Sequence, residues 1–309
     1  MKEKRMSSTE TTERRDPPSA SGSCSNFLIR SIAPWFGGKR TLASEIVKEL
    51  GEHRSYWEPF CGSLAVLFAK PPSSGETVND LHGPLTTLAK VLASDECPNL
   101  YERLLRTTFC EKLFRDVRQR MADGTAMTDL DVAYCFFVES WMGRNGLAGM
   151  RTSNTAFCVR YTSNGGDPSV RFRSAVDSIP GWHQRLRGVW ILQRNAFDLL
   201  ERVEDKRGTV IYCDPPYVTK GASYVHDFKP EDHARLAVLL RRFKETRVVV
   251  SYYDNEHLAE WYPGWTKRAL KATKAMVNQG MRDKAGRTDA PEVLLMNGPS
   301  LVVGATLFG

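Results

Sequence analysis

Short apolar runs alternate with amphipathic segments along much of the chain. In the first amphipathic segment, Leu42, Ile46 and Leu50 recur every four residues and predict a helix with one apolar face. Two units then follow in which a short apolar strand, a turn and a helix succeed one another, at residues 55–70 and 77–92. Consecutive units of this kind favour a parallel, doubly wound α/β sheet.

The same rhythm returns in the last third of the chain. From Val189 a strand and a helix are expected, then the apolar strand 210–212, another helix, and a strand at 247–251. Two alternating segments, near 267–275 and 293–296, predict a β-hairpin that closes the sheet.

Residues 98–186 interrupt this rhythm. Helices are predicted at 100–106, 111–121 and 130–141, followed by a segment rich in Gly, Asn, Ser and Thr whose only strand-like piece is 156–161. Between positions 141 and 190 there are seven arginines, no lysine and only two acids. So long an insertion, biased toward arginine, is more plausibly a functional element than a structureless loop.

The domain organisation follows from these breaks. Residues 27–97 and 187–309 would form one catalytic domain, and residues 98–186 a target-recognition insertion. Residues 1–26 are rich in Ser, Thr and charge without apolar periodicity, so they are predicted to be a disordered tail.

Composition narrows the class of protein. With 41% hydrophobic and 26% charged residues in a chain of 309, a substantial core is expected. The net charge of +7 favours a polyanionic partner, although ordinary solubility explains such a charge equally well. Seven cysteines without a CxxC pair argue against a disulfide framework and a zinc site, and the six histidines show no metal-ligand spacing. No apolar stretch approaches the roughly 20 residues of a membrane span, and no signal peptide is apparent, so a cytoplasmic protein without a metal is predicted.

Three acids each follow a predicted strand: Glu58 in "EPFCGS", Asp80 in "VND" and Asp214 in "DPPY". Singly, each has a structural explanation, namely a tight turn with a helix cap, an N-cap and a β-turn. Together they mark the carboxyl ends of several strands, where open α/β sheets bind ligands.

In this order, "PWFGGK", "EPFCGS", "VND" and "YCDPPY" resemble the Dam-type DNA adenine N6-methyltransferases. The resemblance spans about residues 32–300 and includes "RNGLAG" in the insertion and "APEVLLMN" near the end. It implies a Rossmann-like methyltransferase with a mainly helical DNA-recognition insertion. It further implies S-adenosylmethionine as cofactor and double-stranded DNA as partner, with no membrane and no obligatory protein partner.

The resemblance also implies the residues that bind the cofactor. Gly62 would let the backbone approach the methionine portion, and Asp80 would accept hydrogen bonds from the ribose hydroxyls. The Trp35 indole would pack on the ligand and the Lys39 ammonium would face its carboxylate; the alternatives are a core tryptophan and a surface lysine. The full implied set is Trp35, Gly37, Gly38, Lys39, Glu58, Phe60, Gly62, Asp80 and Asp214.

The acidic turn would perform the chemistry. The exocyclic amine of adenine is a poor nucleophile that needs fixed hydrogen-bond acceptors, and these would be the Asp214 carboxylate and the Pro215 carbonyl. Pro215 and Pro216 would hold these acceptors in place, and Tyr217 would stack on the flipped base. Tyr252 or Tyr253 could flank the same base, although buried core tyrosines are equally plausible.

DNA contacts are expected from polar residues of the insertion. Such residues could read base edges, bind phosphates or be merely solvated. The candidates are Arg144, Asn145, Arg151, Asn154, Arg160 and Arg171. Arg144 stands where the family commonly has an aromatic residue, and Gly149 stands where basic relatives carry a side chain, so GATC recognition is not inferred. The basic loop 281–287 is either a phosphate contact or a polar hairpin tip.

Two other functions remain open from sequence. Cytosine N4 poses the same lone-pair problem as adenine N6, so the acidic turn could serve a cytosine N4-methyltransferase. A non-catalytic DNA-binding protein could also retain this fold, although the intact Asp214 and glycine loop argue against it.

Overall fold

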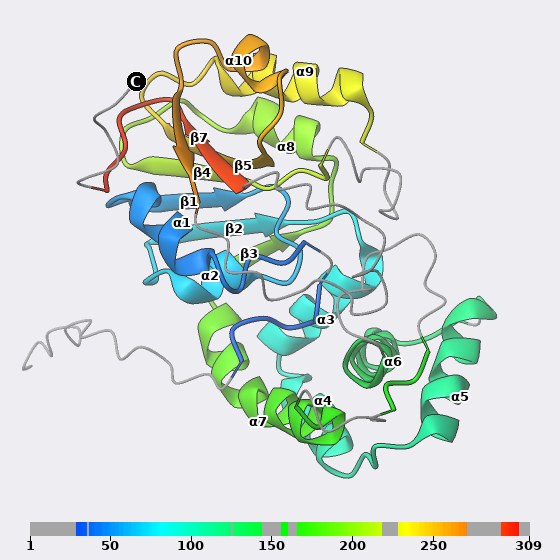
Figure 1. Ribbon diagram of the computed structural model, residues 1–309. Helices are drawn as coiled ribbons and strands as arrows, with labels where there is room; N and C mark the ends of the chain where they lie inside the picture. The colour runs from blue at the N-terminus through cyan, green and yellow to red at the C-terminus, as the bar shows by residue number, and fades with distance from the viewer. Residues whose placement is uncertain are drawn as a thin grey trace, which may run out of the picture.

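A seven-stranded sheet forms the centre of the molecule (Figure 1). The computed structural model describes residues 29–35, 37–124, 126–143, 156–159, 166–217, 228–270 and 292–302. Its strands are β1 (Ser55–Glu58), β2 (Gly75–Asn79), β3 (Val189–Leu192), β4 (Thr209–Cys213), β5 (Arg247–Tyr253), β6 (Thr266–Ala269) and β7 (Glu292–Met296).

The strand order is β3-β2-β1-β4-β5-β7-β6. The first five strands are parallel, whereas β7 is antiparallel to both β5 and β6. The expected parallel sheet and the antiparallel pair at its end are therefore confirmed. Because β7 runs opposite to its neighbours, its first residue lies at the edge where β1, β2, β4 and β5 end.

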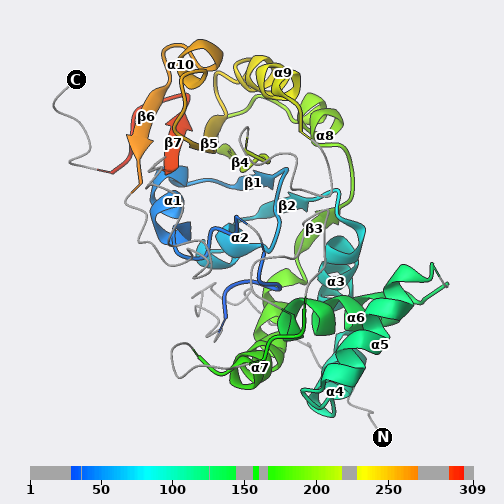
Figure 2. The same cartoon turned by 45° about the vertical axis from the view of Figure 1, so that its right-hand side comes forward.

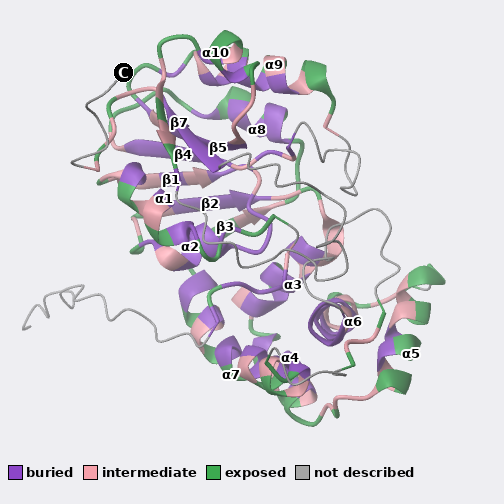
Figure 3. Cartoon of the chain, in the orientation of Figure 1, coloured by how far each residue is buried: buried purple, intermediate pink, exposed green. Residues whose placement is uncertain are grey.

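Helices cover both faces of the sheet, as Figure 2 shows. On one side lie α1 (Ala43–Leu50), α2 (Ala65–Ala69) and α3 (Gly83–Ala93), and on the other α8 (Ala196–Arg202), α9 (Pro230–Leu240) and α10 (Leu258–Trp261). Strand β4 alternates between the two cores: Val210 and Tyr212 pack with α1 to α3, and Ile211 and Cys213 pack with α8 to α10. The central strands β4 and β5 are consequently buried on both faces (Figure 3), as parallel sheets require, whereas the edge strands β3 and β6 are partly exposed.

Four more helices form the insertion below the sheet in Figure 1. They are α4 (Cys97–Leu105), α5 (Glu111–Ala122), α6 (Asp129–Met142) and α7 (Pro168–Leu186). The first three confirm the predicted helices to within a few residues. All four contribute to the core that also contains α1 to α3, so they pack directly on the helices of one face of the sheet.

Helix α7 was not predicted, because the segment that leads into it is rich in Gly, Asn, Ser and Thr. Its start carries ordinary signals, since the Asp167 side chain accepts a hydrogen bond from Ser169 N and Pro168 occupies the first turn. The predicted strand at 156–161 is also wrong within the described residues 156–159. Only an isolated bridge between Gly143 and Phe157 is present there.

Two insertion tryptophans hold the chain that leads into the site. Trp141 Nε1 donates to the carbonyl of Ile32 at 3.0 Å, and Trp182 Nε1 donates to that of Ile29 at 2.8 Å. Both indoles are fully buried. The segment just before Trp35 is thus fixed against α6 and α7.

A buried ion cluster also ties the insertion to the sheet. The Arg185 guanidinium on α7 contacts both carboxylate oxygens of Glu76 on β2, with 2.8 Å between Nη2 and Oε1, and donates to the Leu67 carbonyl at 3.1 Å. Lys70 supplies the second cation to Glu76. All three charged side chains are almost fully buried, so each depends on the others for compensation.

Several expectations concern features that the protein should lack, namely a membrane span, a metal site and disulfide bonds. Within the described ranges, no helix is long and apolar enough to cross a bilayer, and no three His, Cys, Asp or Glu side chains are grouped to hold a metal. The six cysteines that the structure describes form no disulfide with one another. The tail 1–26 and the loop 281–287 lie outside the described residues.

Candidate active site

A cavity opens where the parallel strands end. Its volume is about 220 Å³, more than ten times the roughly 10–15 Å³ that one water molecule needs. It is lined by Trp35, Gly38 and Lys39 before α1, by residues 58–63 after β1, by residues 79–82 after β2, and by Asp214 and Pro216 after β4. The motifs that the sequence analysis singled out therefore converge on one site.

Asp80 is held rigidly at the end of β2. Its Oδ2 accepts from Gly62 N and its Oδ1 from His82 N, both at 2.9 Å. A carboxylate offers about four lone-pair positions, so two backbone amides leave acceptor capacity on a side chain that lines the cavity. This arrangement is compatible with the predicted hydrogen bonds to ribose hydroxyls.

Gly62 allows Trp35 to approach the backbone closely. Its φ is +45°, and a Cβ added there would lie 2.9 Å from Trp35 Nε1. The indole of Trp35 also packs edge-on against the His82 ring, with 5.2 Å between centroids. The glycine is thus required both by its backbone conformation and by the indole beside it.

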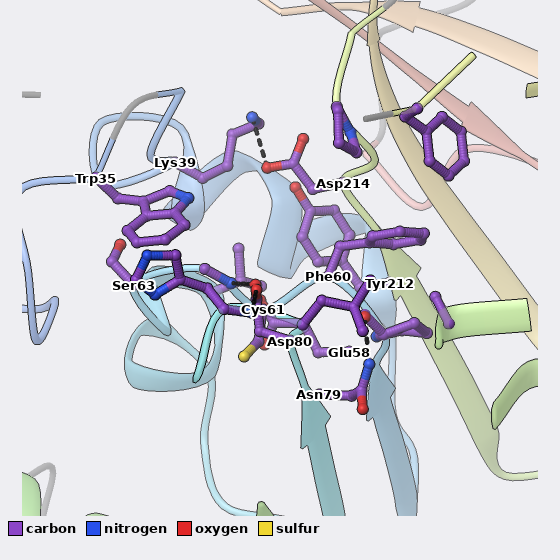
Figure 4. Close-up of a pocket in the computed structure, with 18 of the residues that line it drawn as sticks. Trp35, Lys39, Glu58, Phe60, Cys61, Ser63, Asn79, Asp80, Tyr212 and Asp214 are labelled. Carbon is purple, nitrogen blue, oxygen red and sulfur yellow. Dashed lines mark hydrogen bonds and ion pairs between the residues drawn. The ribbon is translucent and has the colours of Figure 1, made fainter. Parts of the chain in front are cut away.

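Lys39 is buried, not on the surface, with 5% of its side chain exposed. Its Nζ lies 2.7 Å from Asp214 Oδ2 and 3.3 Å from Glu292 Oε1, and it donates to the Gly37 carbonyl at 2.9 Å. Figure 4 shows Lys39 and Asp214 pointing toward each other, with Trp35 beside Lys39 and Asp80 below the pair. Gly37 acts here through its carbonyl and is not among the residues that line the cavity.

Asp214 is the charged centre of the site. Burial raises the pKa of its carboxyl from 3.8 to about 6, against the lowering effect of the Lys39 ammonium; the charge of Glu292 raises it further. Some 19% of the side chain remains exposed, toward the cavity that it lines. Asp214 is therefore ionised at neutral pH but titrates unusually close to it.

Glu58 is a second acid in the cavity wall. Its carboxyl accepts a hydrogen bond from the Tyr56 hydroxyl at 2.8 Å. Burial raises the pKa of Glu58 to about 8, although that hydrogen bond opposes the shift, and the nearby Asp214 carboxylate adds to it. Phe60 lines the same wall and packs edge-on against Phe228, with 5.8 Å between ring centroids.

The acidic turn itself is divided between cavity and core. Pro216 lines the cavity, Pro215 is buried, and Tyr217 is only 3% exposed and does not line it. The Tyr217 ring packs on Tyr253, with 4.3 Å between centroids. Tyr252 is fully buried, with its hydroxyl 3.0 Å from His233 Nδ1, so the core alternative holds for that tyrosine.

Neither Glu292 nor the cavity wall at α8 and α9 was predicted from sequence. Residues 194–197, at the end of β3 and the start of α8, line the cavity together with Phe228, Asp232 and Arg235. Glu292 was overlooked because it precedes an apolar strand instead of following one. Only the antiparallel direction of β7 brings it to the same edge as Asp214.

Of the predicted DNA contacts, Arg171 alone lies within the described residues. It occupies the first turn of α7, and its Nε and Nη2 are buried without a hydrogen-bond partner in the described part of the chain. Burial, and secondarily the charge of Arg171, lowers the pKa of Arg40, so these two guanidinium groups are neighbours. The other five residues fall in the undescribed segments 144–155 and 160–165.

Comparison with known proteins identifies the family. Residues 35–279 match the model of the D12 class N6 adenine-specific DNA methyltransferases. The chain belongs to this family. It is therefore an adenine N6-methyltransferase, and the match favours adenine over cytosine as target and an enzyme over a binding-only protein.

Curated relatives of this D12 class chain are similar over nearly their whole length. The retron Ec67 DNA adenine methylase of Escherichia coli is 27% identical over 89% of this chain and 94% of its own. The DNA adenine methylases of Vibrio cholerae O395 and Escherichia coli K12 are 24% and 22% identical, each over 88% of this chain and 97% of their own.

Proposed function

We propose that this protein transfers a methyl group from S-adenosylmethionine to N6 of an adenine flipped out of duplex DNA. The observation that carries the proposal is the position of Asp214, which follows β4 directly and reaches the cavity in an ion pair with Lys39. The family match supports a methyl donor, which we place in this cavity beside Asp214.

The chain's own residues fit such a donor. S-adenosylmethionine carries an electrophilic methyl group on a sulfonium sulfur. Asp80 retains acceptor capacity for hydroxyl groups, and the walls formed by Trp35, Phe60 and Phe197 suit an aromatic base. An ionised acid in the wall favours a positively charged ligand, and Asp214 supplies it.

Asp214 and Pro215 would act on the amine. The N6 lone pair is delocalised into the purine ring, and it becomes available when the amino group pyramidalises and gains positive charge. A carboxylate oxygen of Asp214 and the Pro215 carbonyl would accept hydrogen bonds from N6 and stabilise that charge. Because the turn is held by two prolines, the acceptors need little reorganisation.

Tyr217 would stack on the flipped base only after a change in its surroundings. Its ring is buried against Tyr253, and the Lys39 ammonium lies 4.9 Å from its centroid. For the flipped adenine to stack on the face of Tyr217, Tyr253 would have to move; otherwise the adenine would contact only the edge of the Tyr217 ring. Tyr217 belongs to the proposed target pocket because its hydroxyl lies 3.2 Å from Asp214 Oδ1.

Duplex DNA would lie against the α7 side of the site. Arg171 and Arg40 place two guanidinium groups near each other beside the chain that carries Lys39. Arg40 is exposed and forms no ion pair with a carboxylate within the described residues, so it can contact a phosphate. The neighbouring Arg171 guanidinium adds positive charge there, although its Nε and Nη2 are buried. The cysteines within the described ranges form no disulfide with one another, which supports a cytoplasmic location for this reaction.

The direct test is methyl transfer from labelled S-adenosylmethionine to mixed-sequence duplex DNA, followed by nucleoside analysis. We expect label in N6-methyladenine. Label confined to cytosine, or no transfer at all, contradicts the proposal.

Asp214→Asn should lower kcat at least about 100-fold, the loss typical of removing one transition-state acceptor or donor. Asp198→Asn, an exposed acid on α8, is the matched control and should retain full activity.

A further inference from the structure

Glu292 is an acid of the site that no sequence motif identified. It begins β7 opposite Tyr253 of β5, and the residue is 8% exposed. Its backbone carbonyl accepts from Leu270 N at 2.7 Å, which fixes the strand to β6 at this point. The carboxylate is thus held by two neighbouring strands within reach of the acidic turn.

The Tyr217 hydroxyl has one hydrogen and two acceptors. Glu292 Oε1 lies at 2.9 Å and Asp214 Oδ1 at 3.2 Å. A phenolic hydroxyl donates one hydrogen bond, so a bond to Glu292 leaves Asp214 Oδ1 without that donor. The shorter distance favours Glu292 as the acceptor.

The Lys39 ammonium is shared in the same way. It lies 2.7 Å from Asp214 Oδ2 and 3.3 Å from Glu292 Oε1, so one cation faces two carboxylates. If Glu292 were absent, both Tyr217 and Lys39 would have Asp214 as their only carboxylate among the described residues of this cluster. Asp214 would then have fewer lone pairs for a substrate amine.

We propose that Glu292 is a positioning residue for Asp214: it takes the Tyr217 hydroxyl and shares Lys39, so that Asp214 keeps an oxygen for the target amine. The inference rests on the proposed methyl transfer and extends it to a residue on a different strand. Glu292 does not itself line the cavity; it acts through Tyr217 and through Lys39, which does.

The charge of Glu292 gives the proposal a measurable signature. Burial is the main cause of the raised pKa of Asp214, and the negative charge of Glu292 adds to it. Replacing Glu292 with a neutral isostere therefore lowers the pKa of Asp214. A residue that merely supported the strand would leave that pKa unchanged.

The experiment compares Glu292→Gln with Glu256→Gln, whose side chain is 90% exposed near the same edge of the sheet. We measure the dissociation constant of S-adenosylmethionine, kcat on duplex DNA, and the pH dependence of kcat/KM. For Glu292→Gln we expect kcat to fall tenfold or more, cofactor affinity to change less than threefold, and the acidic limb to move to lower pH. Glu256→Gln should match the wild type in all three measurements.

Tyr217→Phe provides the coupling test. If Glu292 acts through Tyr217, the double variant Tyr217→Phe/Glu292→Gln should lose less activity than the product of the two single losses. Unchanged kcat and an unmoved acidic limb in Glu292→Gln would overturn the proposal. Multiplicative losses would overturn the route through Tyr217.

Failure of the proposed function can be distinguished from failure of the role proposed for Glu292. If the wild type transfers no methyl to DNA, the function itself is wrong. The pKa of Asp214 can still be measured without substrate from its ¹³Cγ resonance, assigned with Asp214→Asn. A lower Asp214 pKa in Glu292→Gln supports the electrostatic link, and an equal pKa refutes it. If Glu292→Gln folds poorly, Glu292→Asp provides a second variant. Because it keeps the charge, the pKa of Asp214 in Glu292→Asp should stay near the wild-type value.

Discussion

Lys39 Nζ lies 2.7 Å from Asp214 Oδ2, and this ion pair joins the loop before α1 to the turn after β4. Both side chains line the same cavity, so the ammonium helps determine the charge state of the acid that would meet the target amine. The pair also closes the site on the side opposite Asp80 (Figure 4). Replacing either residue should therefore change the rate of methyl transfer more than the stability of the folded protein.

The pH dependence of methyl transfer should follow Asp214. Burial raises its pKa to about 6, so the neutral form accumulates as pH falls through about 6. If the carboxylate is the active form, kcat/KM should decline below that pH, approaching a tenfold loss per pH unit. Methyl-transfer assays with labelled cofactor between pH 5 and pH 8 would measure this acidic limb of the pH profile.

Lys39→Met tests the cause of that limb. The Lys39 ammonium lowers the Asp214 pKa, so its removal should raise that pKa and move the acidic limb to higher pH, together with a loss of activity. Lys48→Met on α1, where 56% of the side chain is exposed, should leave the limb in place. A limb that moves to lower pH in Lys39→Met would contradict the assignment to Asp214.

Gly62→Ala should weaken cofactor binding. The new Cβ would lie 2.9 Å from Trp35 Nε1 at a φ of +45°, so the indole must move out of the cavity wall. We expect at least a tenfold rise in the dissociation constant for S-adenosylmethionine, measured by calorimetry.

Gly124→Ala is the matched control for this substitution. Its φ of +64° imposes a comparable backbone strain, of about 1–2 kcal/mol, but nothing lies within 4 Å of the added Cβ. It should lose stability yet retain cofactor affinity. Equal cofactor affinities in the two variants would show that Trp35 is not part of the binding wall.

Arg171→Gln and Arg40→Gln should weaken DNA binding through phosphate contacts. For each lost phosphate contact, the slope of log affinity against log salt should shrink by about 0.9. Fluorescence anisotropy of labelled duplex at several salt concentrations measures this slope. Arg173→Gln, an exposed neighbour on α7, is the control; a slope unchanged in Arg171→Gln would place the DNA elsewhere.

Arg185→Met should destabilise the protein without touching the cavity. It leaves the buried Glu76 carboxylate with Lys70 alone and removes a donor from the Leu67 carbonyl. Breaking a buried pair in this way costs about 3–5 kcal/mol, visible as a lower thermal unfolding midpoint. Arg187→Met, at an exposed position two residues later, should change the free energy of unfolding by less than about 0.5 kcal/mol. Equal midpoints would show that the cluster does not contribute to stability.

Much of the fold could be predicted from local pattern. Alternation and four-residue spacing identified β1, β2, β4 and β5 and the helices α1 to α6 and α9, because these periods reflect which side of an element is buried. Helix α7 was missed although Phe172, Ile179 and Trp182 share one buried face, because its Gly, Ser and Arg content resembles a loop.

The sequence by itself determined which chemistry the chain carries. Acids after apolar strands, glycines in the first loop and two prolines after Asp214 are local features, and their order was enough to indicate the family. The strand order could not be obtained this way, because pairing between distant strands depends on contacts that no local period encodes.

Tertiary structure alone decided how the site residues combine. It paired Lys39 with Asp214, placed the Tyr217 ring in the core against Tyr253, and brought Glu292 to the acidic turn. Each of these contacts joins segments far apart in sequence. The contact of Tyr217 with Tyr253 depends on the pairing of β4 with β5, and that with Glu292 on β7 lying on the other side of β5. Local pattern fixes the residue types, but only the packed sheet brings their charges within hydrogen-bond distance.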